Sequence, residues 1–575
     1  MSGFFSKERI TAAPGFNRWW VPPASIAIHL CIGSVYAWSI FNPPLMRVLG
    51  VAAPAADDWS LAQTSRTFVV AIVCLGLSAA VAGRWLERVG PRLVGTVAAC
   101  CWGGGFIVGS FGIAWHRLEL LYLGYGVLGG CGLGLGYVSP VSTLIRWFPD
   151  RRGLAAGMAI MGFGGGAIVG VPLKERLLAH FYQAPRFLSP ADQATLETVE
   201  GRRTAMVDGV RREVVVLGAA EAAVASRPTA PGVYVVGTGR TGAVEAFRTL
   251  GVVYLFVMLA AALAYRIPPA GWEPKSRSST TPDVAGRPAI ERAFASATAP
   301  AVRSYDVDEA VRMPQFYLLW IMLCLNVTAG IGVLAVAKTM MTELFGTALP
   351  AIVTSRFAQT FVLMTGVFNM LGRFFWAGAS DYLGRRRTYA VFFALGSVLY
   401  AVVPAIARQA GLDRSVAWLW TFYVVAMLIF TMYGGGFATI PAYLADLFGT
   451  RFVGAIHGRL LTAWSVAGVL GPEAVTALRE RAVAQAVHGL AATVDPQVFA
   501  RRFGAPVERL DELVRNKTVD IAGLLELAPS GTPDPTATLY NSTMYLMAGL
   551  LVVALVANAL VRSPADRRSP EELRV

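Results

Sequence analysis

Apolar runs about 20 residues long recur along the whole chain, and their length constrains the fold more than any other feature. A helix of that length crosses a bilayer core of roughly 30 Å, and in lipid a helix satisfies all its own backbone polar groups. We therefore expect an all-α membrane protein with twelve transmembrane helices. The expected spans are 21–45, 66–85, 92–114, 118–146, 153–172 and 246–266, then 316–340, 352–378, 387–408, 416–444, 453–473 and 542–562.

The charged residues support this class. They make up only 15% of the chain, whereas a soluble domain carries about 25%. The net charge of +14 could indicate nucleic acid, but the arginines gather in short connectors after even-numbered spans, as in cytoplasmic loops. We expect no nucleic-acid partner. We expect a multi-pass protein of the plasma (bacterial inner) membrane with both termini in the cytoplasm, and the first apolar run is too long for a signal peptide.

An internal repeat divides the expected spans into two sets of six. One motif contains Gly83, Glu87, Arg88 and Gly90, and it recurs roughly 290–300 residues later as Ala377, Asp381, Gly384 and Arg385. The segment Gly136-Tyr137-Val-Ser-Pro140 recurs at a similar offset as Gly436-Phe437-Ala-Thr-Ile-Pro441. Such repeats are common in transporters. We expect two pseudo-symmetric six-helix bundles: an N-terminal half 1–266, a cytoplasmic linker 267–312 and a C-terminal half 313–575.

Each half carries one long polar insertion after its fifth span, at 173–245 and 474–541, and both are expected outside the cytoplasm. The first contains Asp208-Gly209, a dipeptide that favours a tight hairpin turn, so we expect it to be partly β. The second has helical periodicity, with helix starts indicated near Pro496 and Pro506. The sequence does not indicate what either insertion does.

Cofactor, metal and enzyme chemistry are not indicated. All six cysteines fall in apolar runs, which predicts neither a disulfide framework nor a metal site. The glycine turn after Val233 lacks the acidic residue of a dinucleotide-binding fingerprint, and no phosphate-binding loop is present. We therefore expect no cofactor, no ATP-driven pumping and no enzymatic activity.

Arg373 is the strongest candidate for a functional residue, because a charge inside a span costs about 2.5–3.5 kcal/mol on insertion scales. Asn369 lies one turn earlier on the same helix face. A guanidinium can hold a carboxylate through two parallel hydrogen bonds. The alternative is a structural arginine that pairs with a neighbouring helix end.

Aromatic residues and one histidine complete the candidate site. Tyr36, Tyr137, Tyr433 and Trp464 could form the walls of a substrate cavity, although each could equally be a core or lipid-facing residue. His29 shares a helix face with Tyr36. It could carry a coupling proton, since histidine titrates near neutral pH, or it could be a neutral packing residue.

The paired loop motifs are candidates for a gate. Glu87 and Asp381 stand at span ends beside arginines, where charge-assisted contacts to a neighbouring helix terminus are expected. Ordinary topology determinants would contain much of the same charge. The proposed gating residues are Gly83, Glu87, Arg88, Gly90, Asp381, Gly384 and Arg385.

These loop motifs resemble the signature of the major facilitator superfamily, with Glu87 where aspartate is usual. More narrowly, the sequence looks like the oxalate/formate antiporter family. That similarity covers nearly all the spans but not the insertions. It is carried by Asn17-Arg-Trp-Trp, Gly33-Ser-Val-Tyr-Ala-Trp-Ser-Ile-Phe-Asn-Pro-Pro44, Pro268-Pro-Ala-Gly-Trp-Glu-Pro274 and Asn326-Val-Thr-Ala-Gly-Ile-Gly332.

The resemblance implies that Arg373 contacts a substrate carboxylate, because an arginine of the eighth span does so in that family. Oxalate carriers add a lysine in the eleventh span, where this sequence has Trp464, so a dianion would be poorly compensated. The Asn369/Arg373 pair is similar to that of bacterial monocarboxylate carriers. The resemblance therefore implies secondary active transport of a monocarboxylate such as lactate, pyruvate or formate.

We expect a monomer that works by alternating access, with proton symport or anion exchange. In this mechanism the two halves would rock about a site where Arg373 anchors the carboxylate. Two other functions stay open: a carrier of another cargo, such as a sugar, a drug or another organic anion, and a membrane sensor that binds a carboxylate without moving it.

Overall fold

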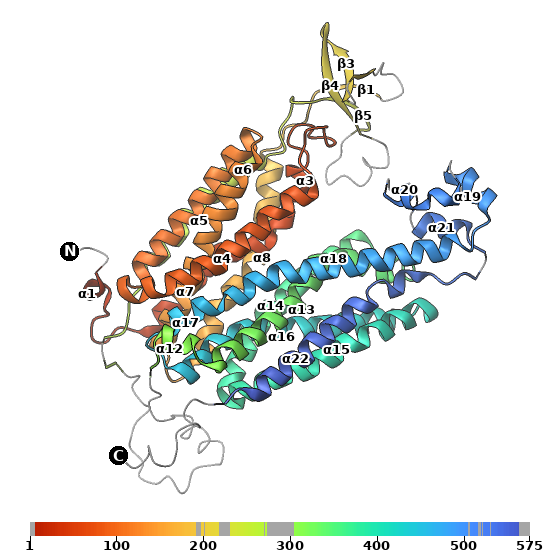
Figure 1. The fold of residues 1–575 in the computed structure, drawn as a ribbon. Helices are drawn as coiled ribbons and strands as arrows, with labels where there is room; N and C mark the ends of the chain where they lie inside the picture. Colours follow the sequence, from red (N-terminus) through yellow and green to blue (C-terminus); the bar gives the residue numbers. More distant parts are fainter. Residues whose placement is uncertain are drawn as a thin grey trace. The chain divides into compact units, whose positions relative to one another are not determined.

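The structure is a computed structural model that describes residues 6–190, 197–199, 202–217, 230–269, 271–272, 304–503, 506–515, 519, 521–529 and 531–562. The chain packs as two compact units (Figure 1). Unit 1 comprises residues 1–312 and 441–465, and unit 2 comprises residues 313–440 and 466–575. Residues 441–465, which belong to the C-terminal half by sequence, thus pack with unit 1. Most of the expected linker, 273–303, lies outside the described residues.

Unit 1 contains the first six long helical segments and a β-sheet. Its helices are α1 (Lys7–Ile10), η1 (Arg18–Trp20), α2 (Val21–Gly33), η2 (Ser34–Ile40), α3 (Asn42–Leu45), α4 (Leu61–Val89), α5 (Pro91–Ala114), α6 (Leu118–Leu121), η3 (Tyr122–Gly129), α7 (Gly130–Trp147), α8 (Arg152–His180), α10 (Ala243–Ala264), α12 (Val307–Val311) and α17 (Val453–Leu460). Its strands are β1 (Phe187–Ser189), β2 (Glu197–Val199), β3 (Arg202–Val207), β4 (Val210–Leu217) and β5 (Gly232–Val235).

The regular secondary-structure elements of unit 2 are all helices among its described residues. Two of its long helices, α16 and α18, begin or end in unit 1. The elements are α13 (Pro314–Phe345), α14 (Ser355–Leu383), α15 (Arg385–Asp413), α16 (Val416–Phe448), α18 (Thr462–Ala491), α19 (Pro496–Phe503), η4 (Val507–Arg509), α20 (Leu510–Arg515), α21 (Ile521–Leu527), η5 (Pro535–Thr538) and α22 (Asn541–Leu560).

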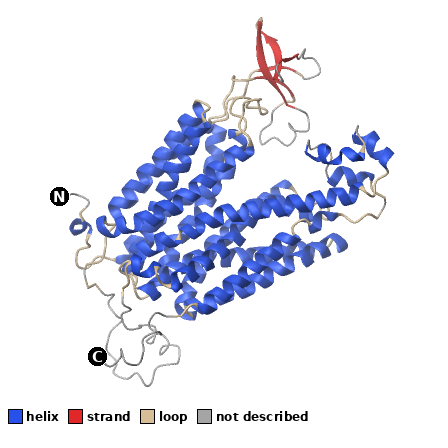
Figure 2. Cartoon of the chain, viewed as in Figure 1, coloured by secondary structure: helices blue, strands red, loops and turns tan. Residues whose placement is uncertain are grey.

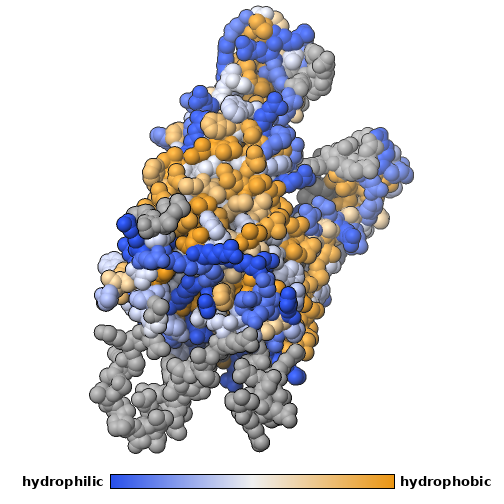
Figure 3. All heavy atoms as spheres, turned by 60° about the vertical axis from the view of Figure 1, so that its left-hand side comes forward, coloured by the Kyte–Doolittle hydropathy of each residue, from blue (hydrophilic) through white to orange (hydrophobic). Residues whose placement is uncertain are grey.

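Twelve helical segments of the described chain are long and apolar enough to cross a membrane, which confirms the expected twelve-helix, all-α membrane class. Figure 3 shows hydrophobic residues over the helices of the face it draws, with hydrophilic residues at both ends of that apolar region. Apolar side chains that face outward in a band of this kind match a lipid environment rather than water.

Two helices run past their expected ends. The spans predicted to stop at residues 172 and 473 continue as α8 to His180 and as α18 to Ala491. Pro172 and Pro472 lie inside these helices and do not end them. A proline removes one backbone hydrogen bond and kinks a helix, and packing against neighbouring helices compensates for that loss. The two helices therefore continue about two and about five turns beyond the expected ends of their spans.

The first transmembrane segment is broken rather than continuous. The α-helix α2 ends at Gly33 and passes into the 3₁₀ segment η2, where Ala37 has non-helical angles (φ −92°, ψ 23°). A change to 3₁₀ geometry in the middle of a span commonly marks a hinge or a strained sequence. The break places the side chain of Tyr36 at the irregular turn.

The insertion in unit 1 forms a five-stranded sheet in the order β1-β5-β4-β3-β2, the only strands among the described residues (Figure 2). Strands β3 and β4 form the expected hairpin, in which Val207 pairs with Val210. Asp208 (φ 51°) and Gly209 (φ 76°) occupy its tip, and the two positive φ angles are those that a two-residue turn with matching twist requires. Val215, Leu217 and Tyr234 of the sheet pack on Ala52, Ala53 and Ala55.

The insertion in unit 2 is helical, as expected. Helices α19, α20 and α21 pack on the last turns of α18 around a small apolar core. Phe499 and Leu524 are completely buried in it, and Val487, Leu490 and Leu510 surround them. The helix starts at Pro496 and after Pro506 agree with the prediction.

Close helix contacts in unit 2 depend on glycine at one position and not at another. A Cβ atom at Gly372 of α14 would lie 2.1 Å from the carbonyl oxygen of Thr431, whereas a Cβ at Gly366 of the same helix would meet nothing within 4 Å. The backbone of α16 therefore leaves no room at residue 372.

We expect Gly372→Ala to destabilise the protein by about 1–3 kcal/mol, the usual cost of overpacking. Gly366→Ala should be neutral or stabilising by up to about 1 kcal/mol, because alanine favours the helix. Thermal unfolding of the two purified variants in detergent measures the difference. Equal melting temperatures would contradict the close packing of α14 on α16.

Candidate functional site

Arg373 is completely buried on α14 in unit 2. Its Nε donates a hydrogen bond to Oδ1 of Asn369, 2.8 Å away and one turn earlier on the same helix. Its guanidinium carbon lies 5.0 Å from the ring centroid of Phe437 on α16. The amide of Asn369 and the aromatic face thus fix the plane of the guanidinium, and such a fixed fork is suited to a planar anion.

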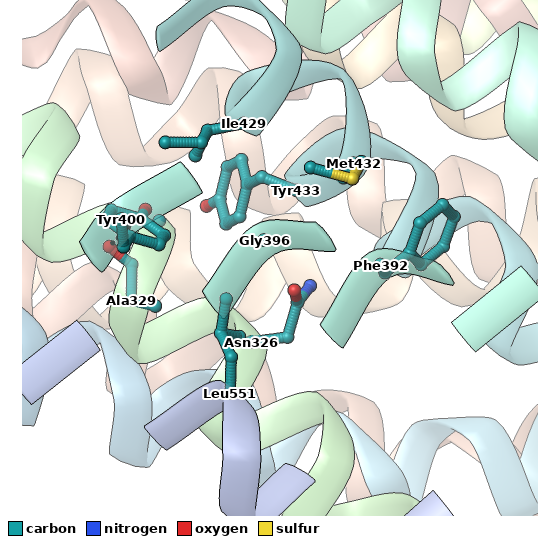
Figure 4. A pocket seen from close by; sticks show the side chains of 10 residues that line it. Asn326, Ala329, Phe392, Gly396, Tyr400, Ile429, Met432, Tyr433 and Leu551 are labelled. Carbon is teal, nitrogen blue, oxygen red and sulfur yellow. Dashed lines mark hydrogen bonds between the residues drawn. The ribbon is translucent and has the colours of Figure 1, made fainter. Parts of the chain in front are cut away.

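Tyr433 of α16 lies one turn before Phe437, and their ring centroids are 5.4 Å apart. It lines a small pocket of unit 2 with Asn326 and Tyr400, shown in Figure 4. The hydroxyl of Tyr400 donates to the carbonyl of Ala329, 3.1 Å away. Nδ2 of Asn326 is buried and has no hydrogen-bond partner among the described residues. Asn326 belongs to the Asn326–Gly332 motif of the family resemblance, but no role for its side chain was predicted from the sequence.

Unit 1 holds an aromatic cluster that contains the other three predicted wall residues. Phe163 of α8 is its centre: its ring centroid lies 5.1 Å from that of Tyr36, 5.3 Å from that of Tyr137 and 5.2 Å from that of Trp464. Tyr137 and Trp464 are 5.4 Å apart. All the contacts have the tilted or edge-on geometry that aromatic pairs prefer. Phe163 was not predicted as a member of this cluster, because a phenylalanine inside a glycine run is typical of ordinary helix packing.

Two buried histidines contact Tyr137. His29 lies edge-on to its ring at 5.2 Å, and Nδ1 of His29 is 3.2 Å from the carbonyl oxygen of Ser25. His457 of α17 lies 5.8 Å from the same ring, and neither of its ring nitrogens has a hydrogen-bond partner within the described residues. His457 was not predicted from the sequence, although it is a titratable residue inside a span, as His29 is.

The two loop motifs have matching backbone geometry. Gly90 (φ 86°) and Gly384 (φ 83°) each join two long helices, and a positive φ favours glycine at both positions. In unit 1 the carboxylate of Glu87 pairs with Arg146 of α7, while Lys7 donates to the carbonyl of Glu87. In unit 2 Asp381 accepts a hydrogen bond from Arg385 at 2.5 Å. Both acids therefore form an ion pair at a helix end.

The remaining gating candidates differ in exposure. Arg88 is exposed. Gly83 is buried against α17, where a Cβ would lie 2.3 Å from the Cα of Ala455. Arg146 also donates to the carbonyl of Arg451, 3.0 Å away. Within unit 1 the motif therefore connects α4, α7 and the start of α17.

The predicted site residues fall into two groups. Arg373, Asn369 and Tyr433 belong to unit 2, and His29, Tyr36, Tyr137 and Trp464 belong to unit 1. Within each unit they are in contact directly or through one aromatic ring. Among the described residues, no group of three or more histidine, cysteine or acidic side chains could hold a metal ion.

Comparison with known proteins identifies the family of this chain. The profile of the Major Facilitator Superfamily matches residues 25–189 and 227–472. The chain belongs to the major facilitator superfamily. The fold agrees: the structure of the Escherichia coli fucose:proton symporter matches with a TM-score of 0.52 at 11% identity, covering 94% of this chain and 99% of the symporter.

Several of the similar sequences are those of carboxylate carriers. The oxalate:formate antiporter of Oxalobacter formigenes is 24% identical and covers 79% of this chain and 83% of its own length. The apicoplast pyruvate carrier 1 of Toxoplasma gondii is 25% identical, with 75% and 78% coverage. Monocarboxylate transporter 12 of Mus musculus is 31% identical over 128 residues, 22% of this chain and 25% of its own length. This major facilitator protein is thus a multi-pass membrane transporter with carboxylate carriers among its relatives.

Proposed function

We propose that this major facilitator protein is a secondary active transporter of a small monocarboxylate such as lactate, pyruvate or formate. Arg373 is the observation that carries the proposal. A guanidinium buried in a membrane span is costly, and such residues mark substrate or ion pathways in membrane proteins. Asn369 and Phe437 hold the guanidinium of Arg373 in a fixed orientation. An arginine that only pairs with a neighbouring helix end does not need such an orientation.

The chemistry of Arg373 favours a carboxylate over a neutral cargo. A guanidinium has five N–H donors. With Nε directed at Asn369, the edge formed by its two terminal nitrogens matches the two oxygens of a carboxylate. A sugar hydroxyl offers no charge and no bidentate geometry. A neutral sugar would therefore compensate the buried charge less well than an acid.

The eleventh span favours one carboxylate over two. Trp464 is completely buried among aromatic rings and stands where the oxalate carriers of the resembling family have a lysine. One buried anchor cation matches one substrate charge, so a dicarboxylate would carry an uncompensated anion into a dry site. The relatives named as an oxalate:formate antiporter and a pyruvate carrier support the broader class of small carboxylates.

We further propose alternating access, with Tyr36, Tyr137, Tyr433 and Trp464 as substrate-contacting aromatic residues. A ligand shifts a conformational equilibrium only through different affinities for the two states, and neutralisation of Arg373 by the bound acid would supply that difference. His29 is the candidate proton carrier for symport. The Glu87 and Asp381 motifs are the candidate gate, and both termini are proposed to be cytoplasmic.

Uptake into proteoliposomes tests the proposal. Labelled lactate, pyruvate, formate and oxalate are offered separately, with and without an inward proton gradient or an internal load of the same acid. We expect a monocarboxylate to accumulate and oxalate to enter at least about tenfold more slowly, a factor that corresponds to about 1.4 kcal/mol. Stimulation by the proton gradient indicates symport, and stimulation by internal acid indicates exchange.

The alternative functions give different results in the same vesicles. A carrier of another cargo would accumulate none of the four acids, and the proton gradient would not change their uptake. A sensor would bind an acid, measured by thermal stabilisation of the purified protein, but would accumulate none. Either result would reject the proposed transport of a monocarboxylate.

A further inference from the structure

Lys174 is a completely buried lysine that neither the family signature nor the proposed substrate site uses. It lies on α8, two residues past Pro172. Its Nζ donates to the carbonyl oxygens of Ser34 at 2.7 Å and of Ala37 at 3.2 Å. The nitrogen also lies 4.8 Å from the ring centroid of Phe41. No carboxylate pairs with Lys174 in the part of the chain that the structure describes.

The ammonium of Lys174 reaches the carbonyl oxygens of Ser34 and Ala37 because α8 lies close to the first transmembrane segment. Gly162, Gly166 and Gly170 recur every four residues, so they share one face of α8, and Lys174 is the next residue on that face. A Cβ at Gly166 would lie 2.4 Å from the carbonyl carbon of Gly33, and one at Gly170 would lie 3.2 Å from Cβ of Ser34. The glycine face therefore allows backbone-to-backbone contact, and the lysine follows at the position where the partner helix breaks.

The two carbonyls belong to the broken part of that helix. Ser34 begins the 3₁₀ segment, and Ala37 is its non-helical residue. Carbonyls of unwound helix segments, left with unused lone pairs and pointing together, are the groups with which discontinuous membrane helices bind coupling cations. Here the position that a free cation would take is filled by an ammonium on a side chain of the same protein.

We propose that the break in the first transmembrane segment is a cation-binding site, and that the ammonium of Lys174 is its permanent, tethered occupant. Two carbonyl acceptors and the face of Phe41 then replace the water shell of the charge. The bound charge in turn fixes the irregular turn that contains Tyr36, whose ring packs on Phe163 at 5.1 Å. Lys174 is thus a positioning residue for the aromatic cluster, and it makes a free metal cation unnecessary at this turn.

Hydrogen exchange read by mass spectrometry tests this proposal without any substrate, so its outcome is independent of the proposed transport function. Lys174→Ala removes a propylammonium group and leaves a cavity of that shape. We expect amide exchange in the peptide 34–45 to become at least about tenfold faster, because hydrogen bonds to a charged group are among the stronger ones. Added propylammonium should restore slow exchange, while choline at equal concentration and neutral propan-1-ol should not.

Two further variants separate charge from packing. Lys174→Met keeps the length of the side chain but not its charge, so it should exchange as fast as Lys174→Ala and should not respond to propylammonium, for which it leaves no space. Lys338→Ala removes an exposed lysine from α13 of unit 2 and should leave the peptide unchanged.

Three results would overturn the proposal. Slow exchange in Lys174→Met would show that the side chain acts by filling space. Rescue by propan-1-ol equal to that by propylammonium would show the same. Faster exchange spread evenly over the peptides of both units would show a general loss of stability rather than release of the broken turn.

Discussion

Replacing Arg373 by alanine is expected to reduce carboxylate uptake by about 100-fold or more while the protein stays folded and inserted. Two charge-assisted hydrogen bonds to one anion, each worth about 1.5–3 kcal/mol, are lost together. The measurement is the initial rate of uptake into proteoliposomes with matched amounts of protein. Unlabelled acid should inhibit uptake by the wild type but should not inhibit the residual uptake by the variant. This difference shows that the variant has lost binding of the acid.

Two matched variants make this result specific. Arg356→Ala removes an exposed arginine near the start of the same helix α14 and should transport like the wild type. Arg373→Lys keeps the charge but not the planar fork, so it should recover only a small part of the rate. Full activity of Arg373→Lys would contradict a bidentate carboxylate contact, and unchanged uptake by Arg373→Ala would make Arg373 a structural residue.

Trp464→Ala is expected to lower the free energy of unfolding by about 3–5 kcal/mol, the usual cost of removing a buried tryptophan side chain. The indole packs on Phe163 and Tyr137 at 5.2 and 5.4 Å, and no side chain of alanine size can fill that space. A decrease of the melting temperature on the order of 10 °C should follow for a unit of this size. Thermal unfolding of the purified variant in detergent measures it.

Comparison with other tryptophan variants tells packing from substrate contact. Trp115→Ala removes an indole of the same unit that is 64% exposed and should cost little in detergent. Trp464→Phe keeps an aromatic ring and should recover most of the stability. If Trp464→Ala keeps its melting temperature but its KM for uptake rises, the indole binds substrate and contributes little to packing.

Much of the fold was predictable because its signals are local. The length of an apolar run decides whether a helix can span lipid, so the twelve spans could be located from the sequence. The hairpin at Asp208-Gly209 was likewise predictable, since the turn depends on two residues that tolerate positive φ. Asn369 and Arg373 are four residues apart on one helix, and their hydrogen bond follows from that spacing. The matching glycines at 90 and 384 follow from the repeat.

The sequence by itself thus determined the membrane class, the spans, the repeat and the placement of Asn369 on the helix face of Arg373. Only the tertiary structure decided where α8 and α18 end, because neighbouring helices compensate the bond that Pro172 and Pro472 remove. It alone placed Phe163 between Tyr36, Tyr137 and Trp464, and it alone brought Lys174 to the carbonyls of Ser34 and Ala37. These contacts join residues far apart in the chain. They depend on how closely two helix backbones approach, and no local period in the sequence encodes that distance.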